Sequence, residues 1–250
     1  MLLHGKKLSN FLSMKNLLIV NCKPNFFKSY IYHSFMSLQK KDFIEIEFTG
    51  KTKDGEIFDS NIKKDIEKAG LKLEAKPFIF ALGEGMFLSG VDEYLIGKEI
   101  GEHKIELESK KAFGLRDSKQ LQMIPIKVFK QHNLMPYAGA VFNFDNRMAK
   151  VLTVSGGRVM VDFNHLLAGK DVIYTVKIFR KIEDLNEKIK AFNDFLFKQD
   201  LKFDIKDKTL IVEVEKPFVQ FVDLFKDKYK DLFGLELKLK EIEKKKESKK

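Results

Sequence analysis

The histidines and the single cysteine are the side chains best suited to hold a metal ion, and their spacing does not suit that task. No two histidines form the HExxH pattern or stand four residues apart. Cysteine-based zinc sites need several thiolates, and Cys22 is the only cysteine, which also excludes an intrachain disulfide. The sequence therefore predicts no metal site. The histidines are His4, His33, His103, His132 and His165.

Motifs for phosphate binding and for covalent catalysis are missing as well. There is no G-x-x-x-x-G-K-[ST] loop, and Gly83-Glu84-Gly85 is only a fragment of a glycine-rich pattern. No serine stands in a G-x-S-x-G turn. If the chain is an enzyme, we expect it to work without a cofactor and without a covalent nucleophile.

Short strands around short helices are expected in residues 41–118 and 162–182. The strand near residue 44 alternates apolar and polar side chains, which is typical of a half-buried strand, and Asp54-Gly55 predicts a hairpin after it. The order favours an α+β fold, an antiparallel half-barrel in which a curved sheet packs on a short helix. Further strands are expected at 78–80, 105–108 and 172–178, and helices at 61–69, with Gly70 as its cap, and at 91–96.

A second strand-rich block lies at residues 119–161. Ser155-Gly156-Gly157 between two apolar runs predicts a hairpin. Flexible methionine side chains adapt to varied apolar partners, so the block could bind unfolded chains, although some of these residues must form its own core. Its methionines and phenylalanines are Met123, Phe129, Met135, Phe142, Phe144, Met148 and Met160.

From residue 183 the apolar period becomes helical. Residues 183–240 predict the order α-β-β-α-β, with one helix near Ile189 and another from Phe218 to Leu232. A separate domain of about 55 residues is only marginally stable alone. The tail at 241–250 is charged and is expected to fray.

The net charge of +10 is weak support for nucleic-acid binding, because residues 1–40 contribute +6 of it through six lysines without any acidic residue. This segment is expected to be a disordered extension, or sequence upstream of a true start at Met36, because its apolar run at 17–20 is too short for a secretory signal. Apolar runs stay far below the roughly 20 residues of a membrane helix. We expect a cytoplasmic protein with no membrane partner.

Four passages together resemble the FKBP-type peptidyl-prolyl cis/trans isomerases, and in particular the SlyD-like branch with its insert-in-flap domain. The resemblance covers roughly residues 41 to 182, and the segments at 112–117 and 164–170 are its most specific parts. It implies an isomerase domain at 41–118 and 162–182, interrupted by a chaperone insert at 119–161. The C-terminal block resembles, more weakly, the extra domain of long archaeal members. The four passages are 48–60, 80–92, 112–117 and 161–170.

The resemblance also implies a cleft between the sheet and the helix, in which X–Pro peptides bind. Asp59 would orient the groups of this cleft, and the N–H of Leu88 would hold a substrate carbonyl. A carboxylate among aromatic positions needs a partner or a function, so Asp59 is the most informative residue. The implied catalytic residues are Phe48, Asp59, Leu88, Phe113 and Tyr174. The implied substrate-binding residues are Phe58, Phe78, Phe87 and Val91, with Met123, Phe129, Met135, Phe142 and Phe144 of the insert.

Two departures from the family pattern affect the expected activity. Phe48 and Phe113 stand where many members carry tyrosine, so two phenolic hydroxyls are missing, and Leu166 follows His165 where proline is frequent. We expect a working but slower active site and poor binding of macrolide inhibitors. His165 is expected to make structural hydrogen bonds and to bind no metal.

Two other functions fit the same sequence. The first is a holdase chaperone with little isomerase activity, and the second is a ribosome- or nucleic-acid-associated module that uses the basic extension and the C-terminal block. For the favoured isomerase function, the expected partners are proline-containing peptides and unfolded or nascent chains, with the ribosome as a further candidate partner. The protein is expected to be a monomer.

Overall fold

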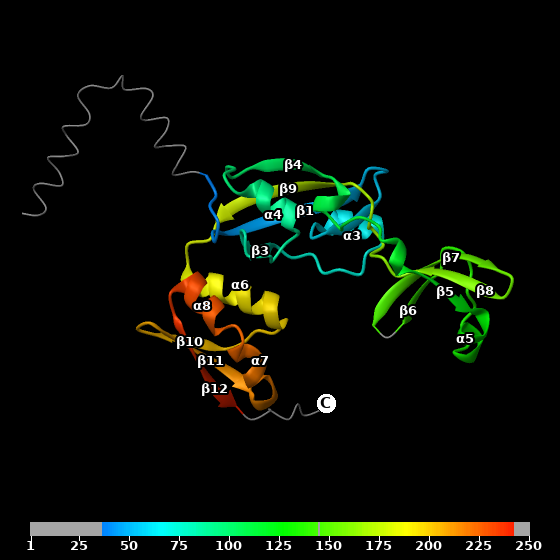
Figure 1. The fold of residues 1–250 in the computed structure, drawn as a ribbon. Coiled ribbons are helices and arrows are strands. Elements are labelled where there is room, and N and C mark those ends of the chain that lie inside the picture. The colour runs from blue at the N-terminus through cyan, green and yellow to red at the C-terminus, as the bar shows by residue number, and fades with distance from the viewer. Residues whose placement is uncertain (1–36, 145, 243–250) are drawn as a thin grey trace, which may run out of the picture.

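The computed structural model describes residues 37–144 and 146–242, which form three sheets with helices packed against them (Figure 1). The expectations for the basic extension up to residue 36, including Cys22, and for the tail from residue 243 fall outside the described residues. Within the described residues, no helix is long and apolar enough to cross a membrane.

The first sheet has five strands, and all of their pairings are antiparallel. Strand β1 pairs along one edge with β9, which has the same length, while β3 and β2 share its other edge. The sheet is therefore continuous although β2 and β3 are short. Its strands are β1 (Phe43–Thr52), β2 (Ile57–Ser60), β3 (Phe78–Ala81), β4 (Glu102–Leu107) and β9 (Val172–Lys181).

Two short helices belong to this part of the chain, which we call the main domain (residues 41–118 and 162–182). Helix α3 (Lys63–Ala69) ends at Gly70, whose φ of 64° is the left-handed conformation that the sequence predicts for this cap. Helix α4 (Ser89–Leu95) begins two residues before the expected position and packs on the sheet through the fully buried Val91. The α+β class is confirmed.

Residues 119–161 interrupt the main domain between β4 and β9, and we call them the insert. Its sheet has the order β5-β8-β7-β6, and the predicted hairpin between β7 and β8 is present, with Gly156 and Gly157 at φ values of 57° and 76°. Strand β5 and helix α5 were not expected. The elements are β5 (Leu121–Pro125), α5 (Ile126–Gln131), β6 (Val141–Phe144), β7 (Arg147–Ser155) and β8 (Arg158–Asp162).

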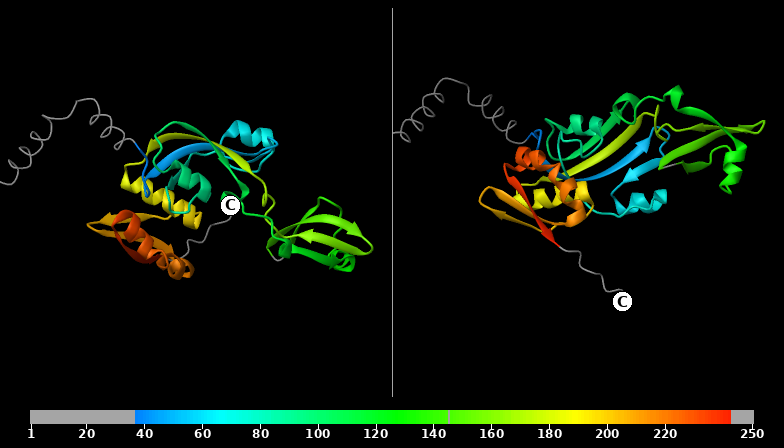
Figure 2. Two further views of the ribbon diagram at one scale, coloured as in Figure 1. Left: turned by 45° about the horizontal axis from the view of Figure 1, so that its top comes forward. Right: turned by 60° about the horizontal axis from the view of Figure 1, so that its bottom comes forward.

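The insert projects away from the main domain and is joined to it by two chain segments (Figure 2). A polar cluster ties these segments together. Asp162 accepts hydrogen bonds from Nε and Nη2 of Arg116 at 2.9 and 2.5 Å. Asn164 bonds both the N–H and the C=O of Asp117. Burial alone would raise the pKa of Asp162, but hydrogen bonds from Asn164 and Arg116 hold this pKa below its usual value. The Asp162 carboxyl therefore stays ionised near neutral pH.

The C-terminal domain (residues 183–242) has a three-stranded sheet in the order β10-β11-β12. The expected single helix after Phe218 is two helices, because Leu224 and Phe225 leave the helical pattern and the N–H of Phe225 bonds the C=O of Val222 in a tighter turn. Its elements are α6 (Leu185–Phe197), β10 (Phe203–Lys206), β11 (Thr209–Glu215), α7 (Val219–Asp223), α8 (Lys226–Phe233) and β12 (Glu236–Ile242).

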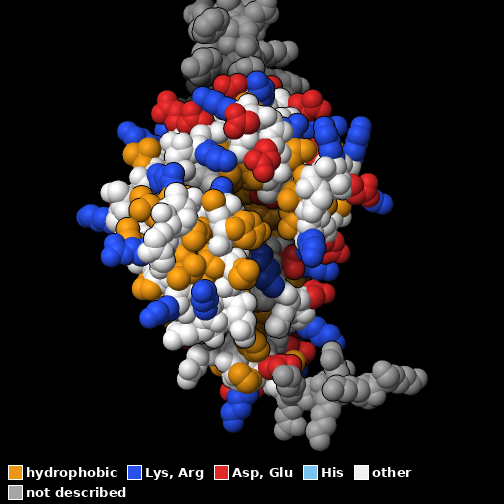
Figure 3. All heavy atoms as spheres, turned by 90° about the vertical axis from the view of Figure 1, so that its right-hand side faces the viewer, with side chains coloured by type: hydrophobic (Ala, Val, Ile, Leu, Met, Phe, Trp, Pro, Cys, Tyr) orange, Lys and Arg blue, Asp and Glu red, His pale blue; other side chains and the backbone are white. Residues whose placement is uncertain are grey.

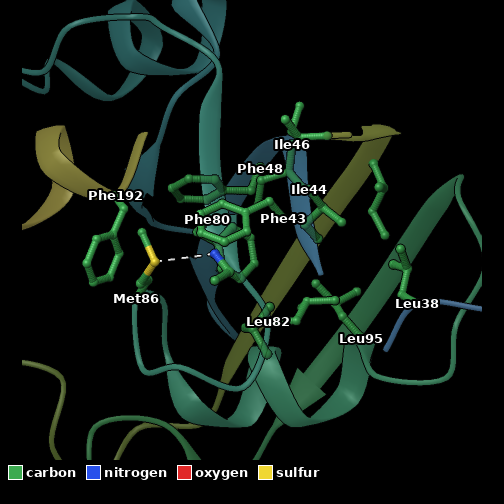
Figure 4. Packing of buried hydrophobic residues seen from close by; sticks show 14 of the residues in the cluster. Leu38, Phe43, Ile44, Ile46, Phe48, Phe80, Leu82, Met86, Leu95 and Phe192 are labelled. Atoms are coloured by element: carbon green, nitrogen blue, oxygen red, sulfur yellow. Dashed lines mark hydrogen bonds between the residues drawn. The ribbon is translucent and has the colours of Figure 1, made fainter. Parts of the chain in front are cut away.

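The main and C-terminal domains share one hydrophobic core, whereas the insert has its own. Figure 4 shows Phe192 of α6 beside Met86 and Phe80 of the main domain. A shared core explains how a block that would be only marginally stable alone remains folded. Leu38 is only 2 % exposed in this core, so residues 37–40 are not part of a disordered extension, which corrects the expected boundary at residue 40.

Candidate active site

Aromatic rings from distant parts of the chain meet above the first sheet. Phe48 of β1 is the centre of this group, and its ring centroid lies 4.8 Å from that of Phe87 and 6.1 Å from that of Tyr174. Phe78 contacts both Phe48 and Phe87 and stacks on Phe80. Apart from the stacked pair of Phe78 and Phe80, the rings meet edge-on or tilted, which is a favourable arrangement for aromatic pairs. They form a dry apolar floor.

Gly50 makes the closest part of this floor possible. It lies opposite both Asp59 of β2 and Tyr174 of β9, and a Cβ at this position would come within 2.9 Å of the Phe58 ring and 3.0 Å of the Tyr174 ring. The register between β1 and β2 shifts between Gly50 and Lys51. Because such a bulge changes the direction of side chains, the consecutive residues Phe58 and Asp59 both face the same cleft.

The cleft has a volume of about 760 Å³ and lies between the first sheet, the segment 86–88 that leads into α4, and the insert. Six of the expected residues line it together: Phe58, Asp59, Phe87, Leu88, Phe113 and Tyr174. The remaining three expected residues of the main domain, Phe48, Phe78 and Val91, pack beneath these and support them.

Asp59 and Tyr174 form the polar part of the floor. Burial raises the pKa of the Asp59 carboxyl, although the N–H of Ser60 partly offsets this. Burial, and then the charge of Asp59, raises the pKa of the Tyr174 phenol, which therefore stays protonated at neutral pH. The floor thus offers one hydroxyl donor close to one carboxylate.

Leu88 presents a free backbone donor at the edge of the cleft. Its C=O accepts the first hydrogen bonds of α4, from Val91 and Asp92, whereas no described residue accepts a hydrogen bond from its N–H. Asp92 fixes the preceding turn, because its Oδ1 accepts the N–H of Gly83 at 2.6 Å. The N–H of Leu88 is therefore held in place and available to a carbonyl group.

Phe113 forms the opposite side of the cleft. Its ring meets Phe58 edge-on at 5.5 Å and stacks on the ring of His165 at 4.6 Å. Nδ1 of His165 accepts the N–H of Leu167 at 3.2 Å, so the expected structural role of this histidine is confirmed. Nowhere in the described residues do three or more His, Cys, Asp or Glu side chains gather in a way that could hold a metal ion.

The expected binding residues of the insert do not lie in this cleft, and they differ in exposure. Met123 and Met135 are 54 % and 82 % exposed. Phe142 and Phe144 are partly buried and pack against Phe129, which is 1 % exposed. Phe129 is therefore part of the insert's core, because the sheet folds around it, and its expected role in substrate binding is wrong.

Residues that sequence reasoning missed complete the cleft. The insert contributes Val141 and Lys150, and the main domain contributes Met86, Lys170 and the rim residue Glu56. The repeated strand pattern shows which side chains of the insert share a face, but not that this face meets the main domain. No signal in the sequence could have identified them.

The exposed apolar surface of the insert continues beyond the cleft. Figure 3 looks toward the insert and shows hydrophobic side chains gathered on this face, with charged side chains around them. Besides Met123 and Met135, the large exposed side chains of the insert include Tyr137 at 68 % and Met148 at 52 %. Apolar groupings of this kind on a surface mark sites of interaction.

Comparison with known proteins agrees with this geometry. The family model described as FKBP-type peptidyl-prolyl cis-trans isomerase matches residues 36–143, and the model described as FKBP26, IF domain, matches residues 122–167. The second match coincides largely with the insert.

Curated relatives give the same result over most of their own length. The short-type peptidyl-prolyl cis-trans isomerase of Methanocaldococcus jannaschii is 30 % identical over 145 residues, which cover 56 % of this chain and 92 % of that protein. The FKBP-type peptidyl-prolyl cis-trans isomerase SlyD of Helicobacter pylori is 27 % identical, covering 61 % of this chain and 79 % of that protein. The FKBP-type 16 kDa isomerase of Escherichia coli is also 27 % identical, covering 57 % and 92 %. The chain belongs to the FKBP-type peptidyl-prolyl cis-trans isomerases, enzymes that interconvert the cis and trans forms of X–Pro bonds.

Proposed function

We propose that the cleft speeds proline-limited protein folding and that the insert holds unfolded segments beside it. One observation supports this most strongly: rings from four separate strands and loops converge with Asp59 on a cleft that the insert also lines. In this proposal residues 41–118 and 162–182 catalyse, residues 119–161 bind chains, and the C-terminal domain extends the core. The single cysteine fits the cytoplasm as the place of action.

The reaction needs a lower rotational barrier and no covalent chemistry. Rotation about a peptide bond meets a barrier of about 18–20 kcal/mol, because the C–N bond has partial double-bond character. The two isomers of an X–Pro bond differ by only about 0.5–1 kcal/mol, so the barrier alone limits the rate. The twisted bond loses resonance and, with it, much of the carbonyl's charge separation. A site that excludes water therefore favours the twisted form over the planar one.

Each group of the cleft has a part in that selection. The floor of Phe87 and Tyr174, supported from beneath by Phe48, takes up the pyrrolidine ring. The free N–H of Leu88 holds a substrate carbonyl and orients the bond. Asp59 keeps the Tyr174 hydroxyl in place and does not transfer a proton to the substrate. This account needs neither of the hydroxyls that Phe48 and Phe113 lack.

The insert supplies the binding of unfolded chains. Its most exposed side chain, Met135 at 82 %, is flexible and polarisable, so it suits partners of varied shape. A chain held there is bound close to the cleft, which raises the effective concentration of its prolines. The core formed around Phe129 keeps this surface folded while its methionines remain outside.

Two assays on the same protein test the proposal. An isomerase assay on an uncharged proline tetrapeptide measures the cleft alone, and proline-limited refolding of a protein measures the cleft and the insert together. We expect wild type to accelerate both. A tetrapeptide rate no higher than the uncatalysed rate would contradict the catalytic cleft and leave a holdase as the function.

A further inference from the structure

Two strands of the insert form part of the catalytic cleft itself. Val141 of β6 and Lys150 of β7 are directly opposed in the antiparallel pair, and both line the cleft with Phe58 and Asp59. Directly opposed residues share a face of a sheet, so this face is turned toward the floor of the main domain. A peptide that fills the cleft therefore touches the insert next to its X–Pro bond.

The mouth of the cleft carries more positive than negative charge. Lys150 and Lys170 come from different parts of the chain, both are exposed, and neither forms an ion pair with any described residue. Glu56 is the opposing carboxylate at the rim, and it likewise forms no ion pair with the residues that the structure describes. Asp59 lies deeper, on the floor.

Two other exposed lysines of the main domain are neutralised locally. The ammonium of Lys53 lies 2.7 Å from Asp171, and that of Lys181 lies 2.8 Å from Asp42. Lys150 and Lys170 differ from these because their charges remain available and face the same cavity. An unpaired ammonium beside a bound peptide attracts a carboxylate on that peptide.

We propose that β6 and β7 form a specificity wall of the catalytic cleft, at which Lys150, together with Lys170, selects substrates with an acidic residue next to the X–Pro bond. The proposal rests on the catalytic cleft described above and adds a substrate preference to it. The same wall makes the insert a part of the active site as well as a holder of chains.

Peptides that differ in one side chain test the preference. The series places Glu, Gln or Lys next to the X–Pro bond, and exchange NMR measures isomerisation without a coupled protease, whose own charge preference would interfere. For wild type at low salt we expect kcat/KM for the Glu peptide to exceed that for the Gln peptide about two- to fivefold, as for an exposed ion pair. The Lys peptide should be the poorest substrate, and 0.5 M salt should reduce the differences.

Charge-reversal variants assign the preference to residues. Lys150→Glu and Lys170→Glu should each lower the Glu-to-Gln ratio, and the double variant should bring it below one. Lys130→Glu is the matched control, because Lys130 is exposed on α5 outside the cleft and carries the same charge change. Its ratio should equal that of wild type.

Three results would overturn the proposal: a wild-type ratio of one, a ratio that Lys130→Glu lowers as much as Lys150→Glu does, or a ratio that responds only to Lys170→Glu. The last result would show that the insert takes no part. If wild type instead showed no activity on an Ala-Pro peptide, the catalytic cleft itself would be rejected. The two failures can therefore be told apart. Circular dichroism confirms that each variant is folded.

Discussion

The main domain and the insert use the same kinds of side chain in opposite ways. In the main domain, Met86 is 5 % exposed, and its sulfur accepts the N–H of Ala81 at 3.3 Å (Figure 4). In the insert, Met135 is 82 % exposed. Composition therefore does not decide whether a methionine is buried in a core or exposed on a surface. The number of layers packed around a sheet determines whether a methionine is buried or exposed.

The physical reason for this contrast is the size of each core. The first sheet is covered by α4 and shares its core with α6, so Met86 and most rings on this sheet pack into a large core, even where they also line the cleft. The insert's sheet has a single short helix, α5, and its core consists mainly of small side chains around Phe129. Large flexible side chains then remain at the surface, where they are available for the chain binding that we propose.

The largest expected effect comes from removing the insert. Replacing residues 119–161 by a short glycine linker should lower catalysis of proline-limited refolding by about 100-fold or more, because the tethering of the substrate is lost. Activity on an uncharged tetrapeptide should change much less, since the aromatic floor remains. The two assays are run side by side on the same preparation. Unchanged refolding catalysis would contradict the hypothesis that the insert holds chains while the main domain catalyses.

A smaller but general loss is expected from the floor of the cleft. The double variant Asp59→Ala with Phe113→Ala should lower kcat/KM about 10- to 100-fold on both the tetrapeptide and the refolding protein, the range for losing a large apolar contact. Phe179→Ala is the control, because Phe179 is 42 % exposed on β9 outside the cleft. Equal kcat/KM for wild type and the double variant would refute the site.

A third variant affects the exposed face of the insert alone. Met123→Glu with Met135→Glu should weaken refolding catalysis about three- to tenfold, because charged groups resist burial against an apolar chain. The tetrapeptide rate should match that of wild type, since neither methionine lines the cleft. Lys127→Glu, with Lys127 exposed on α5, controls for added negative charge. A control that is impaired equally would show that charge, and not apolar contact, was responsible.

The smallest expected effect concerns stability and pH. Burial raises the pKa of Asp59, so the folded protein holds this proton more tightly than the unfolded chain does. The Asp59 contribution to the free energy of unfolding is therefore favourable below the unfolded pKa of about 3.9 and is lost as the pH rises through the folded value. Asp59→Asn should consequently have a higher Tm than wild type at pH 7, but not at pH 3, and should still lose isomerase activity.

Calorimetry at the two pH values measures this difference. Equal Tm values at pH 7 would mean that the Asp59 carboxylate is well solvated, which would argue against a dry floor. The variant thus tests the electrostatics of the cleft separately from its shape.

The local elements were largely predictable, because short-range patterns determine them. The alternation around Ile44, the hairpin at Gly156-Gly157 and the cap at Gly70 all follow from residues near each other in the chain. Helix α5 was missed since its six residues are too few to show a helical period. The break between α7 and α8 was missed because the apolar stripe continues across it.

The candidate site was also predictable in part and unpredictable in part. The passages around Phe58, Phe113 and His165 pointed to one family, and the expected residues of the main domain do lie together. The sequence could not show that Phe58 and Tyr174 pack into the space left by the missing side chain of Gly50. This packing depends on the pairing of three strands, which only the folded sheet provides.

The sequence alone determined the chemistry that is possible here: no pattern for metal, phosphate or covalent catalysis, and a family resemblance that implies an aromatic cleft around Asp59. The tertiary structure alone decided that Phe129 is buried while Met135 is exposed, and that Lys150 enters the cleft of another domain. The reason is physical, because burial and proximity between distant segments depend on how sheets pack. Sequence periods describe one element at a time and carry no information about its partner.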